Sequence, residues 1–267
     1  MTITQPLRLD QIGRTIVRLA AMALFWAAPA WAESPPPPVL SSPHPLAGKV
    51  WNPATGRLAS PAAVIEAGLG AGILILGETH DNPDHHALQA WVVRGLGQSG
   101  RRPIIALEMV DSDHQAALDQ SRQDLAEMGT RLDWEKRGWP LWSLYRPIAE
   151  AALAAGGDLK AANLPQGLTR QIAQGAESAD VDGRFGLDIP LAPAEEKALA
   201  GELRDGHCNL LPETAIAPMI KVQRARDAAM AEVLADQSAR PEAGPVVLIA
   251  GSGHARNDRG IPARLRA

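Results

Sequence analysis

The stretch VVLIAGSGH, residues 246–254, decides the architecture expected of this chain. Its first five residues are all apolar, which is typical of a strand buried on both faces of a sheet. Gly251 comes directly after this run, and His254 stands three residues later. Glycine lets a backbone leave a strand sharply or approach a ligand closely, so His254 is expected just beyond the carboxyl end of the strand.

The same pattern occurs earlier in the chain, as ILILGETH in residues 73–80. Two more apolar runs, residues 104–107 and 159–162, alternate with segments of helical periodicity. This alternation predicts an α/β fold, with a mainly parallel β-sheet flanked by helices. Residues 190–240 are helical in pattern almost throughout, and they predict a helical insertion before the last strand.

Prolines mark the expected helix starts. Ser60-Pro61 and Asn82-Pro83 each place a capping side chain before a proline at the first helical position. Pro147 is expected to open a further helix that ends at Gly156-Gly157.

The chain divides into three regions along its length. Residues 1–32 resemble a secretory signal peptide, because two arginines precede an apolar run that ends in Ala30-Trp31-Ala32. An uncleaved anchor is the alternative, but the run is too short to span a bilayer comfortably. Residues 33–50 are rich in proline and are expected to form an extended, disordered leader. Residues 51–267 are the predicted α/β domain.

Charge and cysteine content limit the partners and the compartment. The formal net charge of −4 gives no basic surplus, so no nucleic acid is expected as a partner. Cys208 is the only cysteine, so no disulfide within the chain is expected. Glu33 rather than a cysteine follows the expected cleavage site, which argues against a lipid anchor. We expect a periplasmic protein that is soluble after signal-peptide cleavage.

Four polar side chains are expected to meet at one edge of the sheet. Glu78 and His80 follow the first strand, Glu108 follows the second and His254 follows the last. Ligands of open α/β sheets bind beyond the carboxyl ends of the strands. Carboxylates and imidazoles of this kind bind a divalent metal ion or carry out acid–base chemistry. The alternative is that each merely caps the helix that follows it, but their common location favours a site.

Other candidates lie on the helices around this edge. His85 and His86 are adjacent on the helix that Asn82 begins, so at most one is expected to face the crevice. Tyr145 and Arg146 end an aromatic segment whose tryptophans we interpret as core packing.

One helix face of the predicted insertion also carries charge. Gln223, Arg226, Asp227 and Met230 share this face. The face points either into the pocket, where Arg226 and Asp227 would pair, or to solvent, and the sequence favours neither. His207-Cys208 is interpreted as structural, because neighbours in sequence rarely have productive geometry.

Taken in order, these motifs resemble the ChaN-like haem-binding uptake family, within the Tiki and TraB superfamily. The resemblance covers roughly residues 51–265 and rests on these stretches in order: Leu76–Asp81 with Pro83, His85 and His86, then Ala106–Met109, Trp139–Pro147, His207-Cys208 with Leu211-Pro212, Gln223–Ala231, and Gly251–Pro262.

The resemblance implies a parallel sheet flanked by helices and a role in bacterial haem or iron uptake. It also implies a haem pocket that a second subunit could complete in a homodimer, and partners among outer-membrane uptake components. Several family members are lipoproteins, and this chain lacks the lipid-bearing cysteine, which puts outer-membrane anchoring in doubt.

The sequence leaves two functions from different classes open. The favoured one is haem binding, with Tyr145 as a phenolate ligand, Arg146 beside it, and His85, His254 and Arg226 lining the pocket.

The alternative is a hydrolase that depends on a divalent metal ion. Its metal site would consist of Glu78, His80, Glu108 and His254, with Glu78 as general base. Arg256 and Asp258 would position the substrate or orient His254.

Overall fold

The structure is a computed structural model that describes residues 34–40, 43–176, 178–240 and 244–266. The expected signal peptide, residues 1–32, lies outside the described residues. Among the described residues, no helix combines the length and the hydropathy that a membrane span requires.

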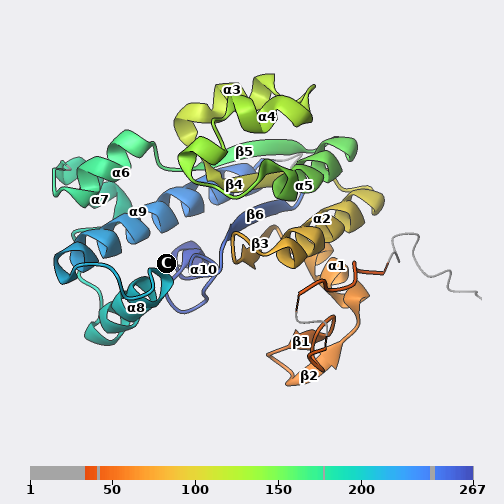
Figure 1. Cartoon of the computed structure of the whole chain (residues 1–267), viewed down its shortest axis with the longest axis horizontal. Helices are drawn as coiled ribbons and strands as arrows, with labels where there is room; N and C mark the ends of the chain where they lie inside the picture. Colours follow the sequence, from red (N-terminus) through yellow and green to blue (C-terminus); the bar gives the residue numbers. More distant parts are fainter. Residues whose placement is uncertain (1–33, 41–42, 177, 241–243, 267) are drawn as a thin grey trace, which may run out of the picture.

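The centre of the fold is a four-stranded parallel sheet in the order β3-β6-β4-β5 (Figure 1). Its strands are β3 (Ile73–Glu78), β6 (Val246–Gly251), β4 (Ile104–Asp111) and β5 (Asp158–Asn163). The last strand in sequence therefore lies between the first two strands of the sheet. This confirms the predicted α/β fold. Glu78 is in register with Gly251, so both G-x-x-H segments leave the sheet side by side.

Helices cover both faces of the sheet, and its central strands β4 and β6 are therefore buried throughout. Alternate residues of β6 point to opposite faces. Val247 and Ile249 pack in the cluster that contains α2 (Pro83–Gln98) and α5 (Trp142–Ala154). Val246 and Leu248 pack in the cluster that contains α9 (Glu213–Ser238) and α10 (Ile261–Arg266).

The helix starts agree with the capping signals in two cases and differ in one. Ser60 caps α1 (Pro61–Gly70), and Asn82 caps α2 by accepting a hydrogen bond from the amide of Asp84. The prediction that Pro147 opens a helix was wrong, because α5 begins at Trp142 and Pro147 lies inside its first turns. Pro147 is the sixth residue of α5, beyond the first four positions whose amides have no partner within a helix, so α5 lacks the hydrogen bond that an amide at 147 would donate to the Ser143 carbonyl.

Between β4 and β5 the chain forms short helical elements: η1 (Ser112–His114), α3 (Gln115–Gln120), α4 (Leu125–Arg131) and η2 (Glu135–Arg137). After β5 come α6 (Gln166–Ala173), α7 (Ala179–Phe185) and α8 (Pro193–Gly206), followed by α9. The expected helical insertion is thus α8 and α9. Of these two, α9 packs directly on the sheet, whereas α8 packs on α9.

The N-terminal region is more ordered than a free leader. A small hairpin of β1 (Val50–Asn52) and β2 (Arg57–Ala59) precedes α1. Ahead of it, the amides of Val39 and Leu40 both donate hydrogen bonds of 2.8 Å to the carboxylate of Asp84 on α2. The described part of the proline-rich segment is therefore held against the domain at Asp84.

Candidate functional site

A cleft of about 990 Å³ opens at the carboxyl edge of the sheet. Its floor is formed by the ends of β3, β4 and β6, and its walls by α8, α9 and the loop after β6. Ligand clefts in α/β proteins occur at this edge. Of the residues predicted from sequence, six line the cleft: Glu78, His80, Glu108, Arg226, His254 and Arg256.

Glu78 anchors the β3 side of the cleft. Its carboxylate is buried, with 2% of the residue exposed. Oε1 accepts hydrogen bonds from the Tyr145 hydroxyl at 2.7 Å and from His80 Nδ1 at 2.8 Å. Oε2 accepts a third, at 2.8 Å, from Gln89 Nε2. Both carboxylate oxygens are therefore engaged by donors, which is unfavourable for the general-base role considered for Glu78.

His80 lines the cleft, and none of the described residues forms a hydrogen bond with its Nε2. Because Nδ1 donates to Glu78, the neutral ring carries its lone pair on Nε2. A Cβ atom at Gly251 would lie 3.0 Å from this Nε2, so the neighbouring strand approaches His80 closely only because residue 251 is glycine. Burial lowers the pKa of His80, but the Glu78 hydrogen bond and the charge of Glu108 outweigh it, so the pKa is raised. The ring also contacts the edge of Trp139.

Glu108 anchors the centre of the floor. Arg226 donates to its Oε1 at 2.6 Å, and the Gly251 amide donates to its Oε2 at 2.6 Å. Burial raises the pKa of Glu108, but the charges of His254 and Arg226 outweigh it and hold the pKa far below its ordinary value. Glu108 is thus an ionised carboxylate that joins β4 to β6 and α9.

His254 lies between two carboxylates. Nδ1 is 2.6 Å from Asp227 Oδ1, and Nε2 is 3.3 Å from Glu108 Oε1. Burial lowers the pKa of His254, but Glu108 and Asp227 outweigh it and raise the pKa to about 9. The pKa of about 9 favours the charged ring at neutral pH, and both of its nitrogens are engaged, which is unfavourable for the metal-ligand role predicted for His254.

Three residues predicted to bind haem lie elsewhere. Tyr145 is 1% exposed and sits beneath Glu78, away from the cleft surface. Burial and the adjacent Glu78 raise its pKa far above the ordinary value, so a phenolate is strongly disfavoured. Arg146 points outward and pairs with Glu150. His85 accepts a hydrogen bond from the Thr79 amide at 2.8 Å and supports the β3 turn from the side away from the cleft.

The loop after β6 also departs from expectation. Arg256 lines the cleft, but Asp258 is exposed and pairs with Arg256 and Arg259. Asp258 does not orient His254. Asp227 does this instead, from the helix face for which the sequence left two orientations open. That face points inward, although Arg226 and Asp227 pair with Glu108 and His254 rather than with each other.

Several residues that line or support the cleft were not singled out from sequence. Gln89 supports Glu78 from α2, and a buried glutamine one helical turn beyond His85 was the available signal. Lys197 and Glu202 line the cleft from α8, where only a helical pattern was visible. His207, interpreted as structural, also lines the cleft, and its Nδ1 donates to the carbonyl of Leu203.

The four residues predicted to bind a divalent metal ion do not form a compact ligand set. Within the described part of the chain, the group of three or more such side chains whose ligand atoms lie within 4.8 Å of one another is Asp111 at the end of β4 with Asp113 and His114 in η1. Arg226 and the Gly251 amide occupy the Glu108 oxygens, and donors occupy those of Glu78. The predicted metal site is not supported by this geometry.

Fold and cleft together define an α/β ligand-binding protein whose site lies at the carboxyl edge of a parallel sheet. The sequence profile of the family described as "Haem-binding uptake, Tiki superfamily, ChaN" matches residues 64–265. The chain belongs to this family.

Two solved structures resemble the chain, and the first of them shares its fold. The structure described as "Cofacial heme binding to ChaN of Campylobacter jejuni" superposes with a TM-score of 0.67 at 24% identity, covering 82% of this chain and 85% of that one. "The structure of the type III effector HopBA1" gives a TM-score of 0.44 at 15% identity, covering 73% and 72%. No curated protein sequence matches the chain.

Proposed function

We propose that this chain is an exported haem-binding protein of bacterial haem or iron uptake, and that it holds haem in the cleft at the carboxyl edge of the sheet. Membership of the haem-binding uptake family supports this. So does the similar fold of ChaN of Campylobacter jejuni, a protein that binds haem cofacially. The cleft volume of about 990 Å³ lies at the upper end of the range of small-molecule and cofactor sites.

The observation that carries the proposal is the hydrogen bonding of the two ring nitrogens of His80. Its Nδ1 is tied to Glu78, and its Nε2 faces the cleft with a free lone pair. Imidazole nitrogen is a common axial ligand of haem iron, and a carboxylate on the other ring nitrogen makes the imidazole a better donor. His80 therefore replaces Tyr145 as the proposed axial ligand.

The cleft also suits the two propionate groups of haem. Lys197 on α8 and Arg256 after β6 both line it and both carry positive charge. Cations of this kind recognise carboxylates by charge-assisted hydrogen bonds. The small and apolar side chains of α8, such as Ala198 and Leu199, form a wall against which a flat ring can lie.

A hemin titration tests the proposal. The wild-type protein should give a saturable shift of the Soret band, and His80→Ala should abolish it or weaken binding at least about tenfold. His114→Ala is the matched control, because His114 is the last residue of η1 and lies outside the cleft. Absence of saturable hemin binding by the wild-type protein would contradict haem as the ligand. Unchanged binding by His80→Ala would contradict the assigned ligand alone.

Export and partners are part of the same proposal. Residues 1–32 would be removed on export, leaving Glu33 at the N-terminus of a periplasmic protein, and a second copy could complete the haem pocket. N-terminal sequencing of the protein from a periplasmic fraction tests cleavage. Sedimentation velocity with and without hemin tests a homodimer. Cytoplasmic retention with Met1 intact would contradict export.

A further inference from the structure

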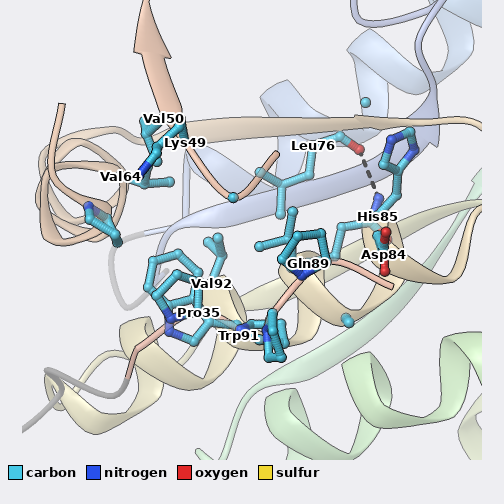
Figure 2. A pocket seen from close by; sticks show the side chains of 18 of the residues that line it. Pro35, Lys49, Val50, Val64, Leu76, Asp84, His85, Gln89, Trp91 and Val92 are labelled. Atoms are coloured by element: carbon cyan, nitrogen blue, oxygen red, sulfur yellow. Dashed lines mark hydrogen bonds between the residues drawn. The ribbon is translucent and has the colours of Figure 1, made fainter. Parts of the chain in front are cut away.

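A second cavity, of about 350 Å³, lies on the other side of the β3 turn (Figure 2). It is bounded by α1, α2, β3 and the segment that precedes β1. None of the residues that line it also lines the cleft. It is therefore a separate space and not an extension of the candidate haem site.

The walls of this cavity are formed mainly by apolar side chains. Val64 on α1, Leu76 on β3, and Leu88 and Trp91 on α2 form one side. The rings of Pro35–Pro38 form the facing side. Figure 2 shows Pro35 opposite Val64 and Val92, with Trp91 beside it. Cavities lined mainly by apolar side chains favour apolar ligand groups, because binding removes apolar surface from water.

The polar groups at one end are already engaged. Asp84 accepts from the amides of Val39 and Leu40. His85 accepts from the Thr79 amide, and Gln89 donates to Glu78. A ligand with a polar body would find no free partner at this end, and the desolvation of its polar groups would oppose binding.

Lys49 adds one cation to the lining. It is exposed and sits one residue before β1, beyond a turn in which Gly48 has φ +70°. An ammonium group at the margin of an apolar cavity selects a ligand with one anionic end. The lining also includes the Asp84 carboxylate, but this carboxylate is bonded to two backbone amides, and Figure 2 shows it well apart from Lys49. Lys49 is therefore the cation available to a ligand at its own end of the apolar interior.

The proline segment closes the cavity like a strap. Proline has no amide hydrogen, so Pro35–Pro38 donate no backbone hydrogen bonds. This strap, Pro35–Pro38, is held at its C-terminal end by the hydrogen bonds that the amides of Val39 and Leu40 donate to Asp84. Val39 itself is 75% exposed. Opening it breaks few interactions, which gives a ligand a way in.

We propose that the cavity beneath Pro35–Pro38 is a second ligand site, which takes a small molecule with a hydrocarbon body and one carboxylate next to Lys49. The site is independent of haem binding in the cleft.

Isothermal titration of the folded protein with decanoate tests this proposal. We expect saturable binding of one decanoate per chain. Leu88→Trp should weaken it at least about tenfold, because the indole fills the cavity from a partly exposed position. Leu210→Trp makes the same change at an exposed position outside the cavity and should leave decanoate affinity unchanged.

Two further comparisons test the charge and the strap. Lys49→Ala should weaken decanoate about two- to fivefold and leave 1-decanol unchanged, whereas Lys136→Ala should change neither. Val39→Pro removes one strap hydrogen bond that Val39→Ala retains, so only Val39→Pro should speed association and release. Three results would overturn the proposal: no saturable decanoate binding, equal affinity of Leu88→Trp and Leu210→Trp, or displacement of bound decanoate by stoichiometric hemin.

Discussion

Tyr145 and His80 donate hydrogen bonds to the same oxygen of Glu78, at 2.7 Å and 2.8 Å. The tyrosine reaches this oxygen from the core and the histidine from the cleft. Glu78 therefore separates the one tyrosine of the chain from the space in which a ligand would lie. The tyrosine sets the position of the carboxylate, and the carboxylate sets the orientation of His80.

Glu78→Gln should weaken hemin binding by about ten- to a hundredfold, the range found when a residue that orients a metal-binding histidine is changed. Glutamine keeps an oxygen for His80 Nδ1 but removes the charge that makes the imidazole a strong donor. Soret titrations measure the effect, and Glu66→Gln, an exposed position on α1, is the control. Equal hemin affinity in both variants would show that Glu78 has only a structural role.

Hemin affinity should rise between pH 6 and pH 8. A proton and the iron compete for Nε2 of His80, and its pKa is raised from 6.5, so binding strengthens as the pH passes through this raised pKa. In Glu78→Gln hemin affinity should begin to rise at a lower pH. The hydrogen bond from His80 then ends on a neutral amide, so it raises the pKa of His80 less. Equilibrium titrations at several pH values measure both profiles. Coincident profiles for the two proteins would contradict the coupling.

Gly251→Ala should reduce hemin affinity at least about tenfold. The new Cβ would lie 3.0 Å from His80 Nε2, so the imidazole must move away from its position. Gly253→Ala is a close control, because its Cβ would meet the end of the flexible Glu202 side chain, which can shift. If the two alanine variants bound hemin equally well, the position of His80 would not matter for binding.

The folded protein should lose stability as the pH rises from 7 to 10. The pKa of His254 is raised from 6.5 to about 9, so its contribution is complete below pH 6.5 and is lost as the pH rises through 9. The loss is at most about 3 kcal/mol, since one pKa unit corresponds to about 1.4 kcal/mol. Urea unfolding at pH 7 and pH 10 measures it.

His254→Gln should be less stable at pH 7 and should lose less between pH 7 and pH 10. His114→Gln, at a partly exposed position outside the cleft, should follow the wild-type profile. A wild-type stability that stays constant over this pH range would mean that His254 is neutral in the folded protein.

Much of the fold could be predicted from the sequence. Continuous apolar runs such as residues 246–250 belong to strands covered on both sides, and capping signals such as Asn82-Pro83 mark helix starts. Strand order could not be predicted, because the position of β6 between β3 and β4 depends on contacts between distant segments. Pro147 gave the wrong helix start because core packing of Trp142, Tyr145 and Ile148 keeps the chain helical on both sides of this proline, although the proline removes one hydrogen bond of the helix.

The meeting of the strand-end residues could be predicted from the sequence, but the contacts of each side chain could not. Residues at strand ends must converge at one edge, which brought Glu78, His80, Glu108 and His254 to the cleft. Whether a histidine ring nitrogen is free depends on partners from other elements, as Asp227 on α9 shows by engaging Nδ1 of His254. Tyr145 was misplaced for the same reason, since its burial beneath Glu78 follows from the packing of α5 on α2.

The most direct test of the account is the identity of the axial ligand, measured by resonance Raman spectroscopy of the ferric hemin complex of the wild-type protein and of Tyr145→Phe. We predict a histidine-ligated complex without tyrosinate vibrations, and the same ligand signature in Tyr145→Phe. The free energy of unfolding of Tyr145→Phe should be lower by about 1.5–3 kcal/mol, because the variant loses a buried hydrogen bond to a charged group. Enhanced tyrosinate bands in the wild-type complex that vanish in Tyr145→Phe would contradict the assignment of His80.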